Sequence, residues 1–491
     1  MAPTTSVDAL ASALVARFLR TNDYSETLQA FIREAGLPSD AGQSSGDDTN
    51  NWTIQQLVEE KKAFDHSSTF ERYAEDSKEN DQWRVPAPSK PSIVSTPSSS
   101  NLLAASVEVW QWHCGAEDVA ETAAVARPVI VSTGADRLVH LLETTTGNEA
   151  VASLTGLSDS PVLSYVSILQ GRFVLMTNMS GQLLLLHGSN VVDRRRDHAK
   201  YAIQVVAHEE EGETASSRRV WIATAGWDAS VCLYRVDIPD GDNTLTIGDP
   251  IARIQTTTNP ESLLFVRHVD SGELLLLVSR RDSTYIYYYG VGAPVGEIDA
   301  PATSPPEGRL LGKQNLAPHS NAWVAFSPAY MALSPHDSGL LAVATSTLPH
   351  LKVMFVRLLF PSTESLAEHS SSATDAQVTQ ASQALEALTL QNREDAAILV
   401  QANTFAPQTA YSTPQVAWRP DGSGVWVNGD DGVIRGIEAK TGKIITMLKN
   451  GHEAGCKVRT IWAGYVTGPG ETTEEWVISG GFDKRLVVWK T

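Results

Sequence analysis

Residues 479–490 read SGGFDKRLVVWK, and this stretch decides the fold. A polar turn around Asp483 follows what reads as the end of a strand. After the turn, Leu486 and Val488 alternate with their neighbours, and the run ends on the aromatic Trp489. Such alternation is typical of a β-strand with a buried face. The stretch therefore predicts two strands joined by a tight turn.

Similar turns recur along the chain. STGADRLVHLLE (132–143), TAGWDASVCLYR (224–235), SRRDSTYIYYY (279–289) and NGDDGVIRGIE (428–438) carry the turn acids Asp136, Asp228, Asp282 and Asp431. Two degenerate copies, TNMSGQLLLLH (177–187) and STLPHLKVMFV (346–356), carry Ser180 and Pro349 at that position. Seven turns indicate a repeat architecture with seven units, and six or eight units are the alternatives.

The last repeat closely resembles the WD-repeat signature, which implies a β-propeller. In that family a His at the start of a blade, a Ser or Thr, the turn Asp and a Trp form a buried hydrogen-bonded tetrad. The resemblance gives these places to His452, Ser479, Asp483 and Trp489. Burying an Asp costs several kcal/mol unless its oxygens accept hydrogen bonds, so we expect structural roles for these residues.

The expected fold is mainly β: a seven-bladed WD40 β-propeller over residues 102–491, preceded by a small α-helical hairpin. The polar stretch at about 361–394 is interpreted as a disordered or partly helical insertion on a blade edge. The chain stops two residues after Trp489, before an outermost strand for the last blade. A segment near residues 90–112 is therefore predicted to supply that strand and close the ring.

At the other end of the chain, residues 7–19 have an apolar face at helical spacing. A turn at Thr21–Tyr24 follows, then a second helix that Ser25 can cap and that Gly36 ends. Two helices this short bury too little apolar surface to fold alone, and pairing with a second copy would solve this.

This hairpin, residues 1–38, closely resembles the LisH motif, in which two such hairpins dimerise as a four-helix bundle. Asp23 stands where the motif usually has Gly, and Asp tolerates the left-handed turn better than most residues. The alternative is an ordinary amphipathic hairpin packed on the propeller. The residues expected to dimerise are Leu10, Leu14, Phe18, Leu19, Tyr24, Leu28 and Phe31.

Two segments join the hairpin to the propeller. Residues 39–83 are acidic and contain a predicted helix at about 52–75, which could extend the dimer, dock on the propeller or bind a partner. Residues 84–101 are rich in Pro and Ser, and this composition favours an extended, solvated linker.

Composition excludes several classes of function. The formal net charge of −19 opposes direct binding to nucleic acid. The three cysteines, Cys114, Cys232 and Cys456, lie far apart and favour a reducing compartment. We therefore expect an intracellular protein, cytoplasmic and/or nuclear. The longest apolar runs fall short of the ~20 residues that span a bilayer, so no membrane span is expected.

Catalytic motifs are missing from the sequence: it contains no HExxH, GxSxG or Walker A pattern. His452 and Cys456 would be two metal ligands without a third, so neither a metal nor a cofactor is expected. The chain is interpreted as a non-enzyme. A propeller enzyme, with catalytic residues scattered over the loops, is the least favoured alternative.

The WD resemblance also implies where partners bind. The residue before each turn Asp and the residues just after each blade's first His lie on one rim of such propellers. The first position gives Trp227, Arg281 and Phe482, and the second gives Lys200, Tyr201, Lys457 and Arg459. The alternative for Trp227 and Phe482 is packing against the neighbouring blade.

These features together predict a non-catalytic scaffold that dimerises through LisH and recruits protein or peptide partners on the propeller rim. The alternative is a substrate-recognition or adaptor subunit of a ubiquitin-ligase or a chromatin/transcription complex.

Overall fold

The computed structural model describes residues 6–43, 53–55, 83–97, 99–111, 126–145, 147–211, 218–238, 245–292, 307–318, 326–361, 380–467 and 473–491. The chain divides into two compact units, Met1–Arg72 and Tyr73–Thr491.

The first unit is a helical hairpin of α1 (Ser6–Thr21) and α2 (Ser25–Ala35). Asp23 takes the left-handed conformation, with φ of 58°, and Gly36 ends α2 in the same region. The prediction that Ser25 caps α2 is wrong, since Tyr24 is the N-cap and its side chain makes no capping bond. Of the helix predicted at about 52–75, only residues 53–55 are described, and Ile54 and Gln55 are helical.

The described part of the second unit forms seven four-stranded antiparallel sheets, which we call blades 1 to 7. The first three are β2 (Leu102–Gln111), β3 (Ala126–Gly134), β4 (Val139–Glu143) and β5 (Ala150–Leu154); β6 (Val162–Ile168), β7 (Phe173–Asn178), β8 (Leu183–His187) and β9 (Asn190–Arg195); and β10 (Ala202–Glu211), β11 (Arg218–Gly226), β12 (Ser230–Ile238) and β13 (Ala252–Gln255).

The other four are β14 (Pro260–Arg267), β15 (Leu274–Arg280), β16 (Tyr285–Gly290) and β17 (Leu310–Asn315); β18 (Pro328–Leu333), β19 (Leu340–Thr345), β20 (His350–Arg357) and β21 (Ile398–Pro407); β22 (Val416–Trp418), β23 (Gly424–Val427), β24 (Ile434–Glu438) and β25 (Ile444–Leu448); and β26 (Val458–Thr467), β27 (Thr473–Gly481) and β28 (Leu486–Lys490) with β1 (Lys90–Val94).

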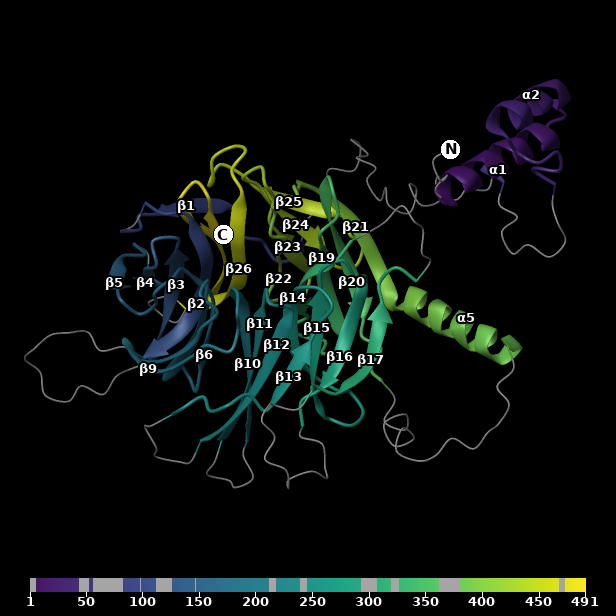
Figure 1. The fold of residues 1–491 in the computed structure, drawn as a ribbon. Coiled ribbons are helices and arrows are strands. Elements are labelled where there is room, and N and C mark those ends of the chain that lie inside the picture. The colour runs from purple at the N-terminus through teal and green to yellow at the C-terminus, as the bar shows by residue number, and fades with distance from the viewer. Residues whose placement is uncertain are drawn as a thin grey trace, which may run out of the picture. The chain divides into compact units, whose positions relative to one another are not determined.

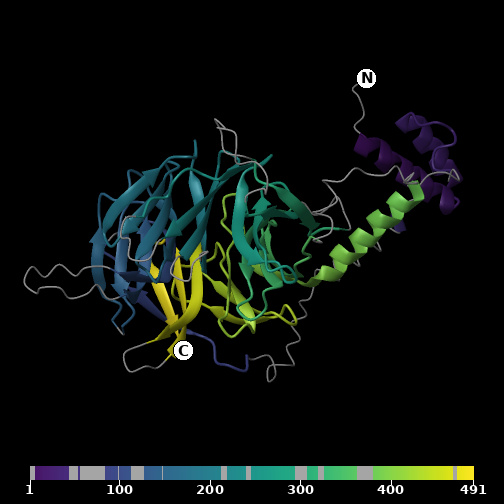
Figure 2. The ribbon, with the colours of Figure 1, turned by 90° about the horizontal axis from the view of Figure 1, so that it is seen from below.

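The blades close into a ring. The first strand of each blade contacts the first strand of the next, from β2 through β22 to β26, and β26 returns to contact β2. Figures 1 and 2 show the sheets arranged around this common centre. Apolar side chains fill the space between neighbouring blades: Leu233 of blade 3, for example, packs in one cluster with Leu263 and Leu276 of blade 4. The predicted seven-bladed propeller is confirmed.

The ring closes through β1, which pairs with β28 from Lys90 opposite Lys490 to Val94 opposite Leu486 (Figure 1). The predicted N-terminal strand of the last blade is thus present. The same pairing corrects the interpretation of residues 84–101 as a solvated linker and of residue 102 as the propeller's boundary. The outer face of β1 is solvated, so Pro and Ser fit this edge strand as well as they fit a linker.

The described part of the propeller unit begins at Trp83, whose ring packs edge-on against Trp426 with 5.2 Å between ring centroids. The insertion after β20 is partly helical, as predicted. Its helix α5 (Gln380–Ala397) is anchored by Gln391, which donates to the carbonyl of Pro318 at 2.8 Å, and by Glu394, which accepts from the backbone N–H of Asn315 at 2.7 Å. Residues 362–379 of the predicted insertion lie outside the described part of the chain.

Candidate interaction face

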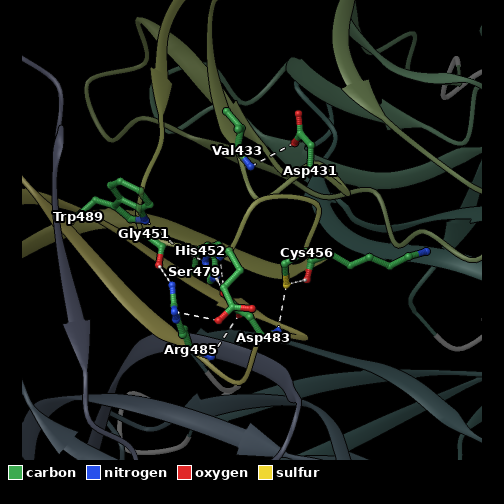
Figure 3. Close-up of polar contacts among 11 residues, drawn as sticks. Asp431, Val433, Gly451, His452, Cys456, Ser479, Asp483, Arg485 and Trp489 are labelled. Carbon is green, nitrogen blue, oxygen red and sulfur yellow. Dashed lines mark hydrogen bonds and ion pairs between the residues drawn. The ribbon is translucent and has the colours of Figure 1, made fainter.

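The turn of blade 7 is held by four side chains from the loop before β26, from β27, from the turn itself and from β28 (Figure 3). His452 Nδ1 lies 3.1 Å from the Asp483 carboxylate, and Nε2 lies 2.8 Å from the Ser479 hydroxyl. The indole N–H of Trp489 donates to the same hydroxyl at 2.9 Å. The structure therefore brings all four tetrad residues into one network.

The Asp483 carboxylate has partners from both a side chain and the backbone. His452 Nδ1 lies 3.1 Å from it. Asp483 also accepts from the backbone N–H of Glu453 at 2.9 Å. Burial alone would raise the pKa of Asp483, but the hydrogen bonds lower it to about 2. An ionised carboxylate thus fixes the turn.

Ser479, His452 and Asp483 also have the residue types of a hydrolytic triad, in which the serine must reach a substrate. Here the serine is 0% exposed, and the His452 and Asp483 side chains are 0% and 1% exposed. The Trp489 indole additionally occupies the hydroxyl. The network is therefore built to hold a turn and not to meet a substrate.

Blade 3 holds a second network of this kind, of which only Asp228 was predicted from sequence. His198 Nδ1 lies 3.1 Å from Asp228, and Nε2 lies 2.8 Å from the Thr224 hydroxyl. Tyr234 stands at the tryptophan position and donates to Asp197 at 3.0 Å. A sequence signal existed, because His198 precedes its turn acid by 30 residues and the histidine of blade 7 precedes its own by 31.

The charge state of His198 follows from these partners. Burial alone would lower its pKa, but hydrogen bonds to Asp228 and Cys232 raise it to about 9. Burial would raise the pKa of Asp228, yet its contacts with His198 and the backbone N–H of Ala199 hold it well below the usual range. Blade 3 therefore contains a buried ion pair at neutral pH.

The remaining predicted turn acids behave differently from one another. Asp136 accepts from the backbone N–H of Leu138 at 3.1 Å. Asp431 accepts from the backbone N–H of Val433 at 3.2 Å (Figure 3) and from Arg435 Nη2 at 2.7 Å. In blade 6, an arginine from β24 therefore contacts the turn acid, as a histidine does in blades 3 and 7.

The role predicted for Asp282 needs correction. Asp282 lies in the turn of blade 4, but it takes the left-handed conformation itself, with φ of 56°. Its backbone N–H donates to the Ser327 hydroxyl at 2.9 Å. The Ser283 hydroxyl accepts from the backbone N–H of Tyr285 at 3.3 Å, the bond to residue i+2 that a turn acid normally accepts. The turn has the same length with its polar roles shifted by one residue.

The predicted rim residues lie where the turns meet the loops that lead into the blades. The backbone N–H of Trp227 donates to the carbonyl of Tyr201 at 2.9 Å, and that of Phe482 to the carbonyl of Lys457 at 3.0 Å. Arg281 makes the equivalent bond to Asn259 at 2.8 Å. The two sets of rim positions are thus adjacent, although they are far apart in sequence.

The rim side chains differ in what they contact. Trp227 stacks on Tyr201 of its own blade, with 5.3 Å between ring centroids, and both rings are about two-fifths exposed, at 38% and 41%. Phe482 is equally open at 41%, and Lys200 is exposed. Lys457 pairs with Asp430 at 3.1 Å. The stacking partner of Trp227 therefore lies in its own blade.

A cavity of about 470 Å³ opens at the centre of this rim. All seven blades line it, through their first strands or the loops that lead into them. Trp227, Arg281 and Arg459 belong to its lining, whereas Lys200, Tyr201, Lys457 and Phe482 do not. Most of the lining carries no sequence signal, because β-strand alternation does not show which buried strand end faces a channel. The lining residues that were not predicted include Glu108, Tyr165, Glu261, Tyr330, Tyr411 and Trp462.

The hairpin has its own candidate surface. Leu14, Phe18, Leu19 and Phe31 are only partly buried within one copy of the hairpin, and Tyr24 is 54% exposed. Leu28 is buried, and of the Leu10 side chain nothing is described. The predicted dimerisation residues therefore include an apolar set that one hairpin leaves partly uncovered.

Within the described residues, no group of three or more His, Cys, Asp or Glu side chains could hold a metal ion. Cys456, considered in sequence with His452 as a ligand pair, instead accepts a hydrogen bond at Sγ from the backbone N–H of Asp483 at 3.0 Å. Among the helices in the described ranges, none has the length and apolarity that a bilayer crossing requires.

Comparison with known families agrees with this architecture. Residues 12–39 match the LisH domain of the UCP007778 family, and residues 325–490 match the β-propeller domain of the same family. No curated protein matches the chain. The hairpin match covers α2 and most of α1, and the propeller match begins just before β18, so each falls on the unit that has the corresponding fold. The chain therefore combines a helical hairpin that matches a LisH domain with a seven-bladed β-propeller.

Proposed function

We propose that this protein is a non-catalytic interaction scaffold of the WD-repeat class, which self-associates through its LisH hairpin and binds protein or peptide partners at the propeller rim. The observation that carries the proposal is the cavity of about 470 Å³ at the centre of the rim, flanked by the exposed rings of Trp227 and Tyr411. Pockets of this size hold ligands, and exposed aromatic residues supply much of the binding energy at protein interfaces.

Self-association is supported by the partly buried leucine and phenylalanine side chains of the hairpin. A second copy would remove them from water at roughly 25 cal/mol for each Å² of apolar surface. Two rims in one dimer would also raise the avidity for a partner with repeated motifs.

The non-catalytic character is supported by what the polar networks do. The His, Ser or Thr, and Asp side chains of blades 3 and 7 are buried and hydrogen-bonded to one another, so they stabilise turns. A cytoplasmic and/or nuclear location is part of the proposal, and it agrees with the free thiols of Cys232 and Cys456.

Light scattering of the purified full-length chain tests the self-association. We expect the mass of a dimer, and we expect a variant with both Leu14→Ser and Phe18→Ser to be a monomer with an unchanged propeller unfolding transition. The matched control changes Leu388 and Leu390 of α5 to Ser, since these leucines are 51% and 48% exposed outside the hairpin. This control should remain a dimer.

A monomeric wild type would refute self-association. It would favour the alternative function, in which the hairpin docks on another subunit of a ubiquitin-ligase or chromatin assembly. A dimer that survives the Leu14 and Phe18 changes would place the contact elsewhere and would refute the role of the hairpin.

A further inference from the structure

The channel at the centre of the rim contains four charged side chains, and three of them have partners. Glu261 pairs with Arg281 at 2.6 Å. Glu108 accepts from the Ser106 hydroxyl at 3.0 Å and from the Ser167 hydroxyl at 2.7 Å. These groups are satisfied within the propeller. The fourth charged group is Arg459.

Arg459 is the second residue of β26 and lines the channel. Its Nη1 is completely buried and has no hydrogen-bond partner among the residues that the structure describes. Burial lowers the pKa of Arg459 to about 10, and no described carboxylate opposes this effect. The guanidinium stays charged at neutral pH, so Arg459 is a cation of the channel wall without an ion-pair partner among the described residues.

An unpaired buried cation destabilises a fold, because the charge loses its hydration without gaining a partner. Groups of this kind persist where binding needs them. A forked guanidinium is suited to an anion with two or more oxygens, which can accept parallel hydrogen bonds.

The surroundings indicate what carries the anion. Tyr411 is 90% exposed and lines the mouth of the channel, and the Trp227 ring lines the same cavity. These rings offer apolar walls to residues that flank the anionic group. A polyanion such as nucleic acid would be repelled by the net charge of −19. A single anionic group escapes most of this repulsion, since salt screens charges beyond about 8 Å.

We propose that the channel binds an acidic side chain of a partner peptide on Arg459, with the flanking residues against Trp227 and Tyr411. This inference rests on the peptide-binding role proposed above and specifies the chemistry of the partner. The anion is a carboxylate or a phosphate, and both present the oxygens that a guanidinium recognises.

Degenerate peptide libraries test the proposal on the full-length chain. Their central residue is fixed as Glu, phosphoserine, Gln or Lys, and the flanking positions are randomised. We expect the wild type to retain the Glu or phosphoserine library about tenfold over the Gln and Lys libraries, as the loss of one charge-assisted bond predicts. Retention of the phosphoserine library alone would identify phosphate as the anion.

Arg459→Met removes the charge and keeps an unbranched side chain, and we expect it to abolish the preference for anionic peptides. Its thermal midpoint should be equal to or above that of the wild type, since a desolvated charge is removed. The matched control is Arg485→Met in the same blade, where the lost guanidinium pairs with Glu453 at 2.9 Å. This control should keep the preference.

Three outcomes would overturn the inference. If Arg459→Met lowers the midpoint and keeps the preference, Arg459 is a structural residue. If the wild type retains all libraries equally, the peptide-binding function stands and the anionic specificity fails. If no library is retained, both fail, and the light-scattering result still decides self-association separately.

Discussion

Arg419 holds Glu475 with both arms of its guanidinium: Nε lies 3.0 Å from one carboxylate oxygen, and Nη2 lies 2.6 Å from the other. Arg419 follows β22 in blade 6, and Glu475 lies in β27 of blade 7. The Arg419 side chain is 0% exposed, and the Trp83 ring packs 4.2 Å from its guanidinium. One buried cation therefore joins two blades to the segment that leads into β1.

Arg419→Ala should lower the free energy of unfolding by about 3–5 kcal/mol, because Glu475 would be left charged and buried without its partner. Urea denaturation of the full-length chain measures this loss. Arg357→Ala is the matched control: Arg357 also lies 2.6 Å from its partner, Asp337, but its side chain is 45% exposed. Its loss should be at most about 1 kcal/mol. Equal losses in the two variants would contradict the role of burial.

Shortened chains test where the propeller begins. A chain starting at residue 83 should fold as a monomeric propeller, since it keeps Trp83 and β1. A chain starting at residue 96 should unfold at lower temperature and self-associate, because β28 would become an exposed sheet edge. Thermal unfolding and light scattering distinguish the two. If both chains behave alike, the N-terminal strand does not close the ring.

The Asp23 turn gives a third prediction. Asp23 holds φ of 58°, where a branched side chain is strained. Asp23→Val should destabilise the hairpin by about 1–2 kcal/mol, while Asp23→Gly should not. Hydrogen exchange of α1 and α2, measured by mass spectrometry, reports this local stability in the full-length chain. Faster exchange in the Gly variant than in the Val variant would refute the prediction.

The features predicted correctly from sequence are those that depend on residues close together in the chain. The turn acid and the tryptophan six residues later identify blade 7, and the apolar spacing of residues 7–19 identifies the hairpin. The features that were not predicted depend on residues far apart in the chain, or on a residue type that differs from the usual one at its position. Arg419, Glu475 and Trp83 lie far apart in the chain and meet only in the folded ring. The network of His198 was overlooked because Tyr234 replaces the expected tryptophan.

The composition around β1 led to a wrong prediction of a linker. The stretch around residues 90–94 has the Pro and Ser of a linker, yet an outermost strand needs apolar residues on one side only, and Val94 alone of these five is buried. At Asp282 the residue type matched the repeat pattern, but the role was wrong. The neighbouring Ser283 hydroxyl accepts the hydrogen bond of the turn, and the left-handed residue of the turn is Asp282 itself.

The ion pair of His198 and Asp228 predicts how stability depends on pH. The folded pKa of His198, about 9, lies above the value of about 6.5 in an unfolded chain. Its contribution is therefore fully present below pH 6.5 and is lost as the pH rises through 9. Asp228 has a lowered pKa, so its contribution is present above about pH 4 and is lost on further acidification.

Between pH 6.5 and 8.5, the free energy of unfolding should fall by about 2 kcal/mol, since the folded state keeps a proton that the unfolded state releases. Urea denaturation at several pH values in this window measures the slope. The window ends where the Cys456 thiol of the unfolded chain begins to lose its proton, at about pH 8.5, because burial raises the pKa of that thiol in the folded state to about 11. His198→Gln should remove this fall, whereas the control His336→Gln, at an exposed histidine, should keep it. The lowered pKa values of His140 and His208 can give only a small rise in the same window. A slope that persists in His198→Gln would show that another group binds the proton.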